Sequence, residues 1–373
     1  MYRLHQILDI FRNKELDELY LSISLRDLAL AMIGIFAPIY LLKLNYSFAD
    51  VMIFHILMSV FTIFFTLLLV SKIADGWGIK HSMIYGIPVI LVFFLMLSSI
   101  DVYNWPLWVI SIFGGLSTTL FWTGYHIHFA TFSKQKNRGE AISFSFIFRL
   151  MFHIIGPILG GIIMSTYGFK TLFLVVSFIF LLSIIPLLMS KDIHRPINFS
   201  LKQVFQDQKI NDAIAITGYG AELALWIVWS IFIYLYILND FTKLGLATSL
   251  VAIFMVVSLF IFGRLSDISR SKMLKIFGVL NSGVWFLKMF VTSAVHVNLV
   301  SGLYGLISGG VAVPFTAITY DNANKSNIVE YNIFREIMLH IGKIFVFLVV
   351  IFMDDIQKTF ILGSVIGLLY LLF

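Results

Sequence analysis

Four ionisable residues lie deep inside apolar stretches of this sequence, where a charge is costly. Arg149 and Arg335 could together clamp an anionic group, because a guanidinium binds a carboxylate or phosphate through two parallel hydrogen bonds. Asp27 and Glu222 are candidate proton carriers, since a carboxylate in a low-dielectric cavity can load and release a proton near neutral pH. A charge at the middle of a bilayer costs about 2.5 to 3.5 kcal/mol, so we expect these residues to line a polar cavity.

Two histidines accompany these charges. His153 lies one helical turn beyond Arg149, and His340 follows Glu336 by four residues, on the same face of a helix. Because histidine titrates close to neutral pH, either could also serve as the proton site.

A purely structural role is the alternative for the same residues. Arg26 stands beside Asp27, and Arg335 stands beside Glu336. Each neighbouring pair could form a permanent ion pair that only locks helices together. The sequence leaves both interpretations open.

A stripe of rings follows one helix face at Trp122, Tyr125, His126 and Phe129. Such a stripe fits helix packing, and it also fits the wall of a cavity. His126 and His128 are two residues apart and therefore diverge on a helix, so we expect no metal site. The chain has no cysteine, which excludes thiolate metal sites and cysteine nucleophiles.

The composition requires lipid as the solvent. The 373 residues are 60% hydrophobic and 12% charged, with a mean hydropathy of +0.95, whereas a soluble domain carries about 25% charged residues. Apolar runs recur at the length of membrane-crossing helices. We expect an all-α integral membrane protein with twelve spans, at roughly 19–42, 49–71, 82–100, 105–131, 140–166, 169–190, 212–238, 244–265, 273–293, 295–320, 328–352 and 358–373.

Internal repetition divides these spans into two like halves. An Asp precedes a Lys by five residues in two polar turns, at Asp75 and Lys80 and again at Asp267 and Lys272. Two other pairs of segments match in the same order, namely 27–30 with 222–225 and 147–149 with 333–335. Repeated halves are typical of transporters, so we expect two pseudo-symmetric six-helix bundles.

The expected domains follow from this repeat. Residues 1–18 form an interfacial segment, 19–190 the first bundle, 191–211 a linker, and 212–373 the second bundle. Most Lys and Arg outside the spans fall on the side that holds the N-terminus, which predicts that this side is cytoplasmic. We expect a multi-pass protein of the cytoplasmic (inner) membrane. Because the net charge of +6 follows membrane topology, we expect no nucleic-acid partner.

The repeated turn resembles a motif of the major facilitator superfamily, which runs Gly-x-Leu-Ala-Asp-Arg-x-Gly-Arg-Lys. Asp75, Gly78 and Lys80 match in the first copy, and the second copy keeps part of the pattern. The matching residues of the second copy are Gly263, Leu265, Asp267 and Lys272. The resemblance implies two six-helix bundles and a gate at the cytoplasmic side, in which these residues hold the gate closed.

A second motif lies in the fifth span. Gly156, Pro157, Gly160 and Gly161 resemble the Gly-Pro-x-x-Gly-Gly sequence found in that helix of many exporters of the family. Phe152 stands where the exporter pattern has a further Gly, so the motif is incomplete. We expect these small residues to allow close helix packing.

The residues and the resemblance together predict a secondary transporter, not an enzyme. No Gly-x-x-x-x-Gly-Lys-Ser/Thr motif for ATP is present, and we expect no cofactor. We expect alternating access, coupling to protons, a small anionic or zwitterionic organic solute, and a monomer in the lipid bilayer. The alternatives are an exporter of amphipathic drug-like compounds and a non-transporting receptor or assembly factor.

Overall fold

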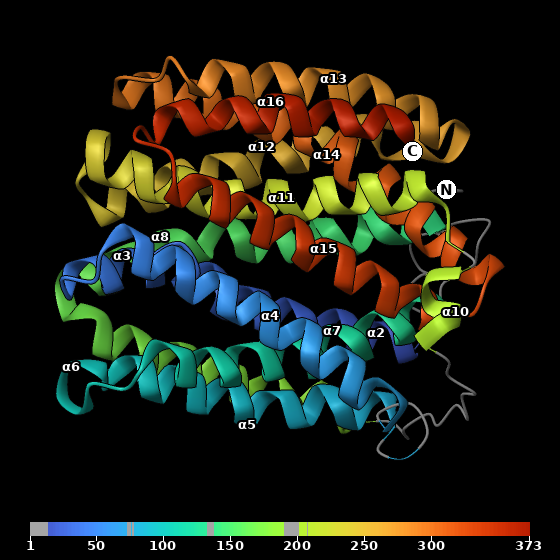
Figure 1. Ribbon diagram of the computed structural model, residues 1–373, viewed down its shortest axis with the longest axis horizontal. Helices are drawn as coiled ribbons and strands as arrows, with labels where there is room; N and C mark the ends of the chain where they lie inside the picture. The colour runs from blue at the N-terminus through green and yellow to red at the C-terminus, as the bar shows by residue number, and fades with distance from the viewer. Residues whose placement is uncertain (1–13, 73–75, 77, 133–137, 190–200, 207) are drawn as a thin grey trace, which may run out of the picture.

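Long apolar helices make up the computed structural model of the chain, which describes residues 14–72, 76, 78–132, 138–189, 201–206 and 208–373 (Figure 1). All regular structure in these ranges is helical, so the expected all-α fold is confirmed for them. The helices lie roughly side by side along the long axis. We name the two ends of the bundle by short helices that lie there, the α10 end and the α6 end.

The helices of the first half alternate in direction between the two ends. They are α2 (Lys14–Ile33), α3 (Ala37–Lys43), α4 (Phe48–Lys72), α5 (Ile79–Ser98), α6 (Ile100–Tyr103), α7 (Leu107–Phe132), α8 (Arg138–Leu182) and α9 (Ile184–Leu187).

The second half is reached through the short helix α10. Its elements are α10 (Leu201–Gln206), α11 (Ile210–Ile233), η3 (Tyr234–Leu238), α12 (Phe241–Ile268), α13 (Arg270–Lys288), α14 (Ala294–Lys325), α15 (Ile328–Ile351), η4 (Gln357–Thr359), α16 (Phe360–Leu369) and η5 (Tyr370–Leu372).

Each predicted span coincides with a helix in the described ranges. Eight stretches are long and apolar enough to cross a membrane. One of them contains two predicted spans, because α8 is broken at Gly168, where φ is 79° and ψ is 175°. The remaining three predicted spans coincide with α13 and α15, which carry more charge, and with the shorter α16.

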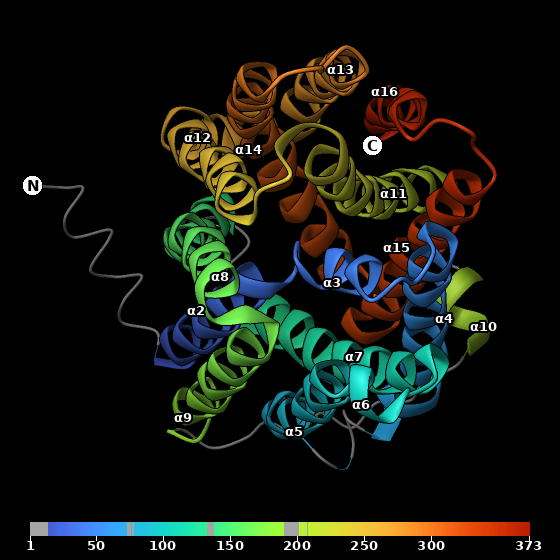
Figure 2. The same cartoon turned by 90° about the vertical axis from the view of Figure 1, so that its left-hand side faces the viewer.

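The two halves meet through two equivalent pairs of helices. α4 packs against α15, and α8 packs against α12, as the view along the bundle shows (Figure 2). These helices hold the second, eleventh, fifth and eighth predicted spans, so each contact is the counterpart of the other under the repeat. The pairing leaves α7, α8, α11, α14 and α15 to enclose the space between the halves.

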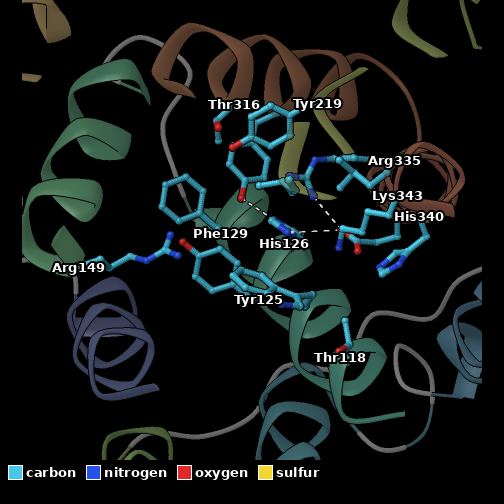
Figure 3. Close-up of a pocket in the computed structure, with 15 residues that line it drawn as sticks. Thr118, Tyr125, His126, Phe129, Arg149, Tyr219, Thr316, Arg335, His340 and Lys343 are labelled. Atoms are coloured by element: carbon cyan, nitrogen blue, oxygen red, sulfur yellow. Dashed lines mark hydrogen bonds and ion pairs between the residues drawn. The ribbon is translucent and has the colours of Figure 1, made fainter. Parts of the chain in front are cut away.

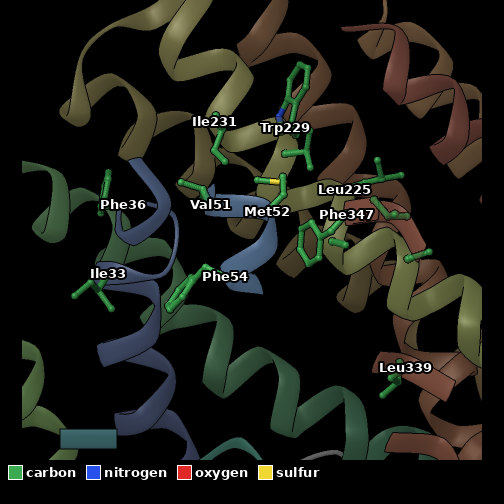
Figure 4. Close-up of a cluster of buried hydrophobic side chains, with 14 of the residues drawn as sticks. Ile33, Phe36, Val51, Met52, Phe54, Leu225, Trp229, Ile231, Leu339 and Phe347 are labelled. Atoms are coloured by element: carbon green, nitrogen blue, oxygen red, sulfur yellow. The ribbon is translucent and has the colours of Figure 1, made fainter. Parts of the chain in front are cut away.

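Apolar side chains from both halves join in one buried cluster (Figure 4). Val51, Met52 and Phe54 of α4 face Leu225 and Trp229 of α11 in this cluster. Many large apolar side chains outside this buried cluster are exposed, as expected for helices that face lipid chains.

Glycines let α8 approach its neighbours closely. A Cβ on Gly156 would lie 2.7 Å from the Cβ of Ala31 in α2, and one on Gly161 would lie 2.7 Å from the Phe241 carbonyl oxygen of α12. Across the same contact, a Cβ on Gly245 would collide with the Pro157 carbonyl. These residues therefore hold α8 against one helix of each half.

Gly160 gives a test of this packing. Its substitution Gly160→Ala would place a methyl group against the Met32 carbonyl and 2.9 Å from Phe36 Cε2. We expect this overpacking to cost about 1 to 3 kcal/mol and to lower the unfolding temperature of the purified protein. Gly283→Ala is the matched control, because nothing lies within 4 Å of its Cβ position and alanine favours a helix by up to about 1 kcal/mol. Equal unfolding temperatures for the two variants would contradict the packing role.

Candidate functional site

A cavity of about 290 Å³ lies between the two halves, and most of the predicted site residues line it (Figure 3). Both arginines contribute to it, Arg149 from α8 and Arg335 from α15. Figure 3 shows them on opposite sides of the cavity, with His126 between them. The structure therefore brings together the two arginines that the sequence pairs by the repeat.

Asp27 neutralises the first arginine. Its carboxylate accepts a hydrogen bond from Arg149 Nε, and His153 Nε2 lies 3.6 Å from the same oxygen. Asp27 is 3% exposed, so this buried pair fastens α2 to α8. The neighbouring Arg26 makes a different contact, because its guanidinium lies 3.8 Å from the ring centre of Phe121.

Glu336 links the second arginine to the other half of the molecule. Arg335 Nη1 donates to Glu336 Oε1 at 2.8 Å, and His126 Nε2 of α7 lies 3.5 Å from that oxygen. His126 Nδ1 is also 2.7 Å from the Tyr320 hydroxyl of α14. This network joins α7 to α14 and α15 across the interface. Arg335 Nε has no hydrogen-bond partner among the described residues.

Aromatic rings cover much of the cavity wall. Trp122, Tyr125, His126 and Phe129, the stripe found in the sequence, all line the cavity. Phe129 also stacks on Tyr320 of the other half at a centroid distance of 4.9 Å. The rings thus combine helix packing with the walls of a cavity.

His340 and Lys343 complete the charged lining on α15. His340 is 4% exposed, and its Nδ1 has no hydrogen-bond partner within the described part of the chain. The lining of this cavity therefore contains three cationic residues, Arg149, Arg335 and Lys343. It contains one carboxylate, that of Glu336.

A second cavity of about 280 Å³ adjoins the first. The two share Arg149, Tyr219 and Leu223 in their linings. The second cavity contains both carboxylates predicted to carry a proton, Asp27 and Glu222, together with His153. Its other walls are mainly apolar. They include Leu150, Trp226, Val251, Ala252, Met255, Val311 and Ala312.

Four donors converge on Glu222. Its Oε1 accepts from Asn281 Nδ2 at 2.9 Å, Trp285 Nε1 at 3.3 Å and the Tyr304 hydroxyl at 2.9 Å. Its Oε2 accepts from the Tyr370 hydroxyl at 2.6 Å. Glu222 is therefore held rigidly at the wall of the second cavity by residues from α13, α14 and η5.

Lys288 lies beside this carboxylate and is absent from the residues that the sequence singled out. The side chain is fully buried, and its ammonium lies 3.4 Å from the ring centre of Trp285 and 4.2 Å from that of Tyr304. The sequence did contain a signal for this site, because Lys288 is a charged residue inside an apolar span and follows Trp285 by three positions. The signals for Tyr304 and Tyr320 were weaker, because tyrosine is common near membrane helix ends.

The predicted gate residues lie mostly at the α10 end. Gly78 has a φ of 89°, a conformation that glycine adopts without strain, and it precedes the first turn of α5. Lys80 is buried and its Nζ lies 3.1 Å from Glu18 Oε2 of α2. Helix α2 thus begins before the predicted span at residue 19. Asp75 lies outside the described residues.

The second copy of the gate motif differs from the first. Gly263 and Asp267 belong to α12, but their side chains lie outside the described part of the structure. Lys272 is exposed in the first turn of α13. Arg270, which replaces the motif glycine, forms an ion pair with Asp321 of α14.

Comparisons with known proteins identify the fold. The sequence model of the Major Facilitator Superfamily matches residues 19–210. The crystal structure of the human organic anion transporter MFSD10 is similar, with a TM-score of 0.72, 11% identity, and coverage of 96% of this chain and 98% of that chain. No curated protein matches the sequence significantly.

Two structures of the transporter FucP are similar as well. FucP in its outward conformation gives a TM-score of 0.69 at 14% identity, covering 95% of this chain and 96% of that one. A variant of the E. coli fucose:proton symporter FucP gives 0.67 at 14% identity, with the same coverages. Likeness at such low identity establishes the fold alone, while the match to the family covers more than half of the chain. The chain therefore belongs to the Major Facilitator Superfamily and is a multi-pass membrane protein with the fold of its transporters.

Proposed function

We propose that this protein is a proton-coupled secondary transporter that moves a small organic anion by alternating access. The observation that carries the proposal is the position of Arg149 and Arg335 on opposite sides of one cavity. Guanidinium groups suit carboxylate, sulfonate and phosphate groups because their donors form a planar fork. Arg335 Nε also lacks a partner among the described residues, so it has a donor to offer.

The charges around the cavities favour an anion. Asp27 offsets Arg149, and Glu336 offsets Arg335, which leaves the positive charge of Lys343 in the first cavity. A cavity with excess positive charge and low-dielectric walls concentrates negative solutes. The proposal therefore assigns the charged head of the solute to the first cavity.

The second cavity supports a substrate with an apolar part. It joins the first at Tyr219 and Leu223, and its walls are mainly apolar, so one amphipathic anion could occupy both. A structurally similar protein is an organic anion transporter, and another is a fucose:proton symporter, which support an organic anion and proton coupling respectively. Export of amphipathic compounds is a second candidate, favoured by the same apolar walls.

Closure at each end supports alternating access. At the α6 end, Phe241 of the second half contacts Phe36 and Phe169 of the first, at centroid distances of 6.0 and 5.7 Å. At the α10 end, Phe129 and Tyr320 bring the halves together. Opening one contact while keeping the other would expose the cavities to one side. We assign the α10 end to the cytoplasm, in an inner membrane, from the distribution of Lys and Arg. The alternative of a non-transporting receptor or assembly factor would be favoured by the absence of a polar cavity at these charges, whereas two cavities contain them.

Removal of one arginine should weaken transport of an organic anion. The probe is naphthalenesulfonate, an amphipathic anion with a fixed charge, measured by counterflow in proteoliposomes. Because a hydrogen bond to a charged group contributes about 1.5 to 3 kcal/mol, we expect Arg335→Gln to raise KM by about tenfold to a hundredfold. We expect Arg149→Ala to have an effect of similar size.

Lys170→Gln is the matched control for loss of a cation. Lys170 is exposed and pairs with Asp101 at 3.1 Å at the α6 end, outside both cavities. The KM of the Lys170→Gln variant for naphthalenesulfonate should equal that of the natural protein. Unchanged counterflow in both arginine variants would refute the anion clamp.

The contact at the α10 end gives a test of alternating access. Tyr320→Phe removes the hydroxyl that bonds His126 across the two halves. Since a buried hydrogen bond contributes about 0.5 to 1.5 kcal/mol, the state open at this end should become about twofold to tenfold more populated. The chain has no natural cysteine, so a single Thr316→Cys substitution in the first cavity reports access to a membrane-impermeant maleimide.

Labelling is measured in vesicles that expose the α10 end. Thr316→Cys should react about twofold to tenfold faster when combined with Tyr320→Phe, as estimated from the lost hydrogen bond. Tyr46→Phe serves as the control, because Tyr46 lies between α3 and α4 at the other end. A labelling rate that does not change with Tyr320→Phe would show that this contact does not close the cavity.

A further inference from the structure

The ammonium of Lys288 occupies a box of four aromatic rings. Its Nζ lies 3.4 Å from the ring centre of Trp285, 4.2 Å from Tyr304, 4.9 Å from Trp229 and 5.0 Å from Trp226. The side chain is 0% exposed, and Nζ has no hydrogen-bond partner among the described residues. Aromatic faces attract a cation electrostatically, so the rings replace the water that the ammonium lacks.

The same rings hold Glu222. Trp285 and Tyr304 donate hydrogen bonds to its Oε1 from their polar edges, while their faces are turned toward Lys288. The carboxylate and the ammonium are thus two parts of one assembly, held by shared walls. Trp226, Tyr304 and Glu222 also line the second cavity, so this assembly borders the proposed substrate path.

The hydrogen bonds of Glu222 leave one position for a proton. Asn281 Nδ2 and Trp285 Nε1 can only donate, so Oε1 is an acceptor in this arrangement. Oε2 receives a single bond, from the Tyr370 hydroxyl. Because a hydroxyl can also accept, a proton on Oε2 could bond to the Tyr370 oxygen after that hydroxyl rotates. The network can therefore hold Glu222 charged or neutral.

The cation beside Glu222 differs in kind from those beside the other cavity carboxylates. Asp27 pairs with Arg149, and Glu336 pairs with Arg335. A guanidinium stays charged in proteins and keeps its partner carboxylate ionised, whereas a buried lysine changes protonation state more readily. Asp27, Arg149 and His153 line the same cavity as Glu222, and Asp27 and Arg149 are paired with each other. Besides Lys288, the groups that surround Glu222 directly among the described residues are neutral. They are Tyr219 on α11, Asn281 and Trp285 on α13, Tyr304 on α14 and Tyr370 on η5.

We propose that Glu222 and Lys288 together form the proton-coupling site of the transporter. A proton from the water of the second cavity binds Glu222 Oε2 and returns to water on the other side of the membrane. The pair is neutral when Glu222 is ionised and carries one positive charge when Glu222 is loaded. That extra charge at the cavity wall attracts the anion, so proton and anion strengthen each other's binding. This inference rests on the proposed function.

The proton site can be observed without any ligand. Infrared difference spectra of the purified protein, recorded across about pH 5 to 8, should contain the C=O band of a protonated carboxyl group, because a coupling site must titrate near its working pH. The band should lose its Glu222 component in Glu222→Gln, whose amide oxygen can keep the three bonds to Oε1 while its NH2 donates to the Tyr370 oxygen. Asp212→Asn is the matched control, since Asp212 is a buried carboxylate bonded by Asn322 and Tyr331 and lines neither cavity. A band whose intensity is the same in Glu222→Gln as in the natural protein overturns the proposal.

Binding of naphthalenesulfonate tests the coupling. In the natural protein its Kd should rise about fivefold or more from pH 5.5 to pH 8, a coupling of the usual size between two sites. The double variant Glu222→Gln with Lys288→Met keeps the pair neutral, so its Kd should change less than about twofold over the same range. We expect it to fold, because it buries no unpaired charge. It should show no accumulation of the anion driven by a pH gradient.

The outcomes separate the two proposals. If the natural protein moves no naphthalenesulfonate while the infrared band titrates and depends on Glu222, the anion-transport proposal fails and the proton site stands. If the double variant still accumulates the anion in a pH gradient, the coupling site is elsewhere and this inference fails. Should the double variant not fold, Glu222→Gln alone decides the question, since proton-driven accumulation in that variant overturns the inference equally.

Discussion

Burial of charge between two apolar bundles is the constraint on which the rest of this structure depends. An ionised group in such an environment must be matched nearby, because an isolated buried charge costs many kcal/mol. At the level of the cavities, Asp27 pairs with Arg149 in the first half. In the second half, Trp285 donates a hydrogen bond to Glu222 and turns its ring face to Lys288. Glu336 adds a third carboxylate on the interface itself. The positions of the helices around the cavities follow from the need to bring these partners together.

Close packing makes that arrangement possible. The glycines of α8 bring its backbone against α2 in one half and α12 in the other, so Arg149 reaches Asp27 while still facing the cavity. A helix with larger residues at these positions would stand farther from both neighbours. The same helix therefore carries Arg149, the proposed anion-binding group of the first half, and makes one of the two contacts between the halves.

The sequence predicted the helices and the level of the site well, for a physical reason. Apolar runs report lipid exposure directly, and a charge inside such a run stands out, as Asp27, Arg149, Glu222 and Arg335 did. Contacts between side chains of different helices were harder to predict. They depend on how each helix is rotated about its axis relative to its neighbours, and the hydrophobic periodicity does not define that rotation. Asp27 was expected either to carry a proton or to pair with Arg26; in the structure it bonds Arg149 and lies near His153. The sequence did not predict the environment of Lys288, because its partners are aromatic rings and such rings are common in all membrane helices.

The network around Glu336 connects substrate binding to closure in the proposed transporter. Glu336 Oε1 accepts a hydrogen bond from Arg335 and lies 3.5 Å from His126 of the other half. An anion that binds Arg335 Nε, which has no partner among the described residues, shares the charge of the guanidinium with Glu336 and so weakens the bond from Nη1 to that carboxylate. The carboxylate keeps His126 as its other partner, and His126 in turn bonds Tyr320 at the closed α10 end. Occupation of the first cavity therefore acts directly on the residues that hold α7 against α14 and α15, with no need for a longer path through the bundle.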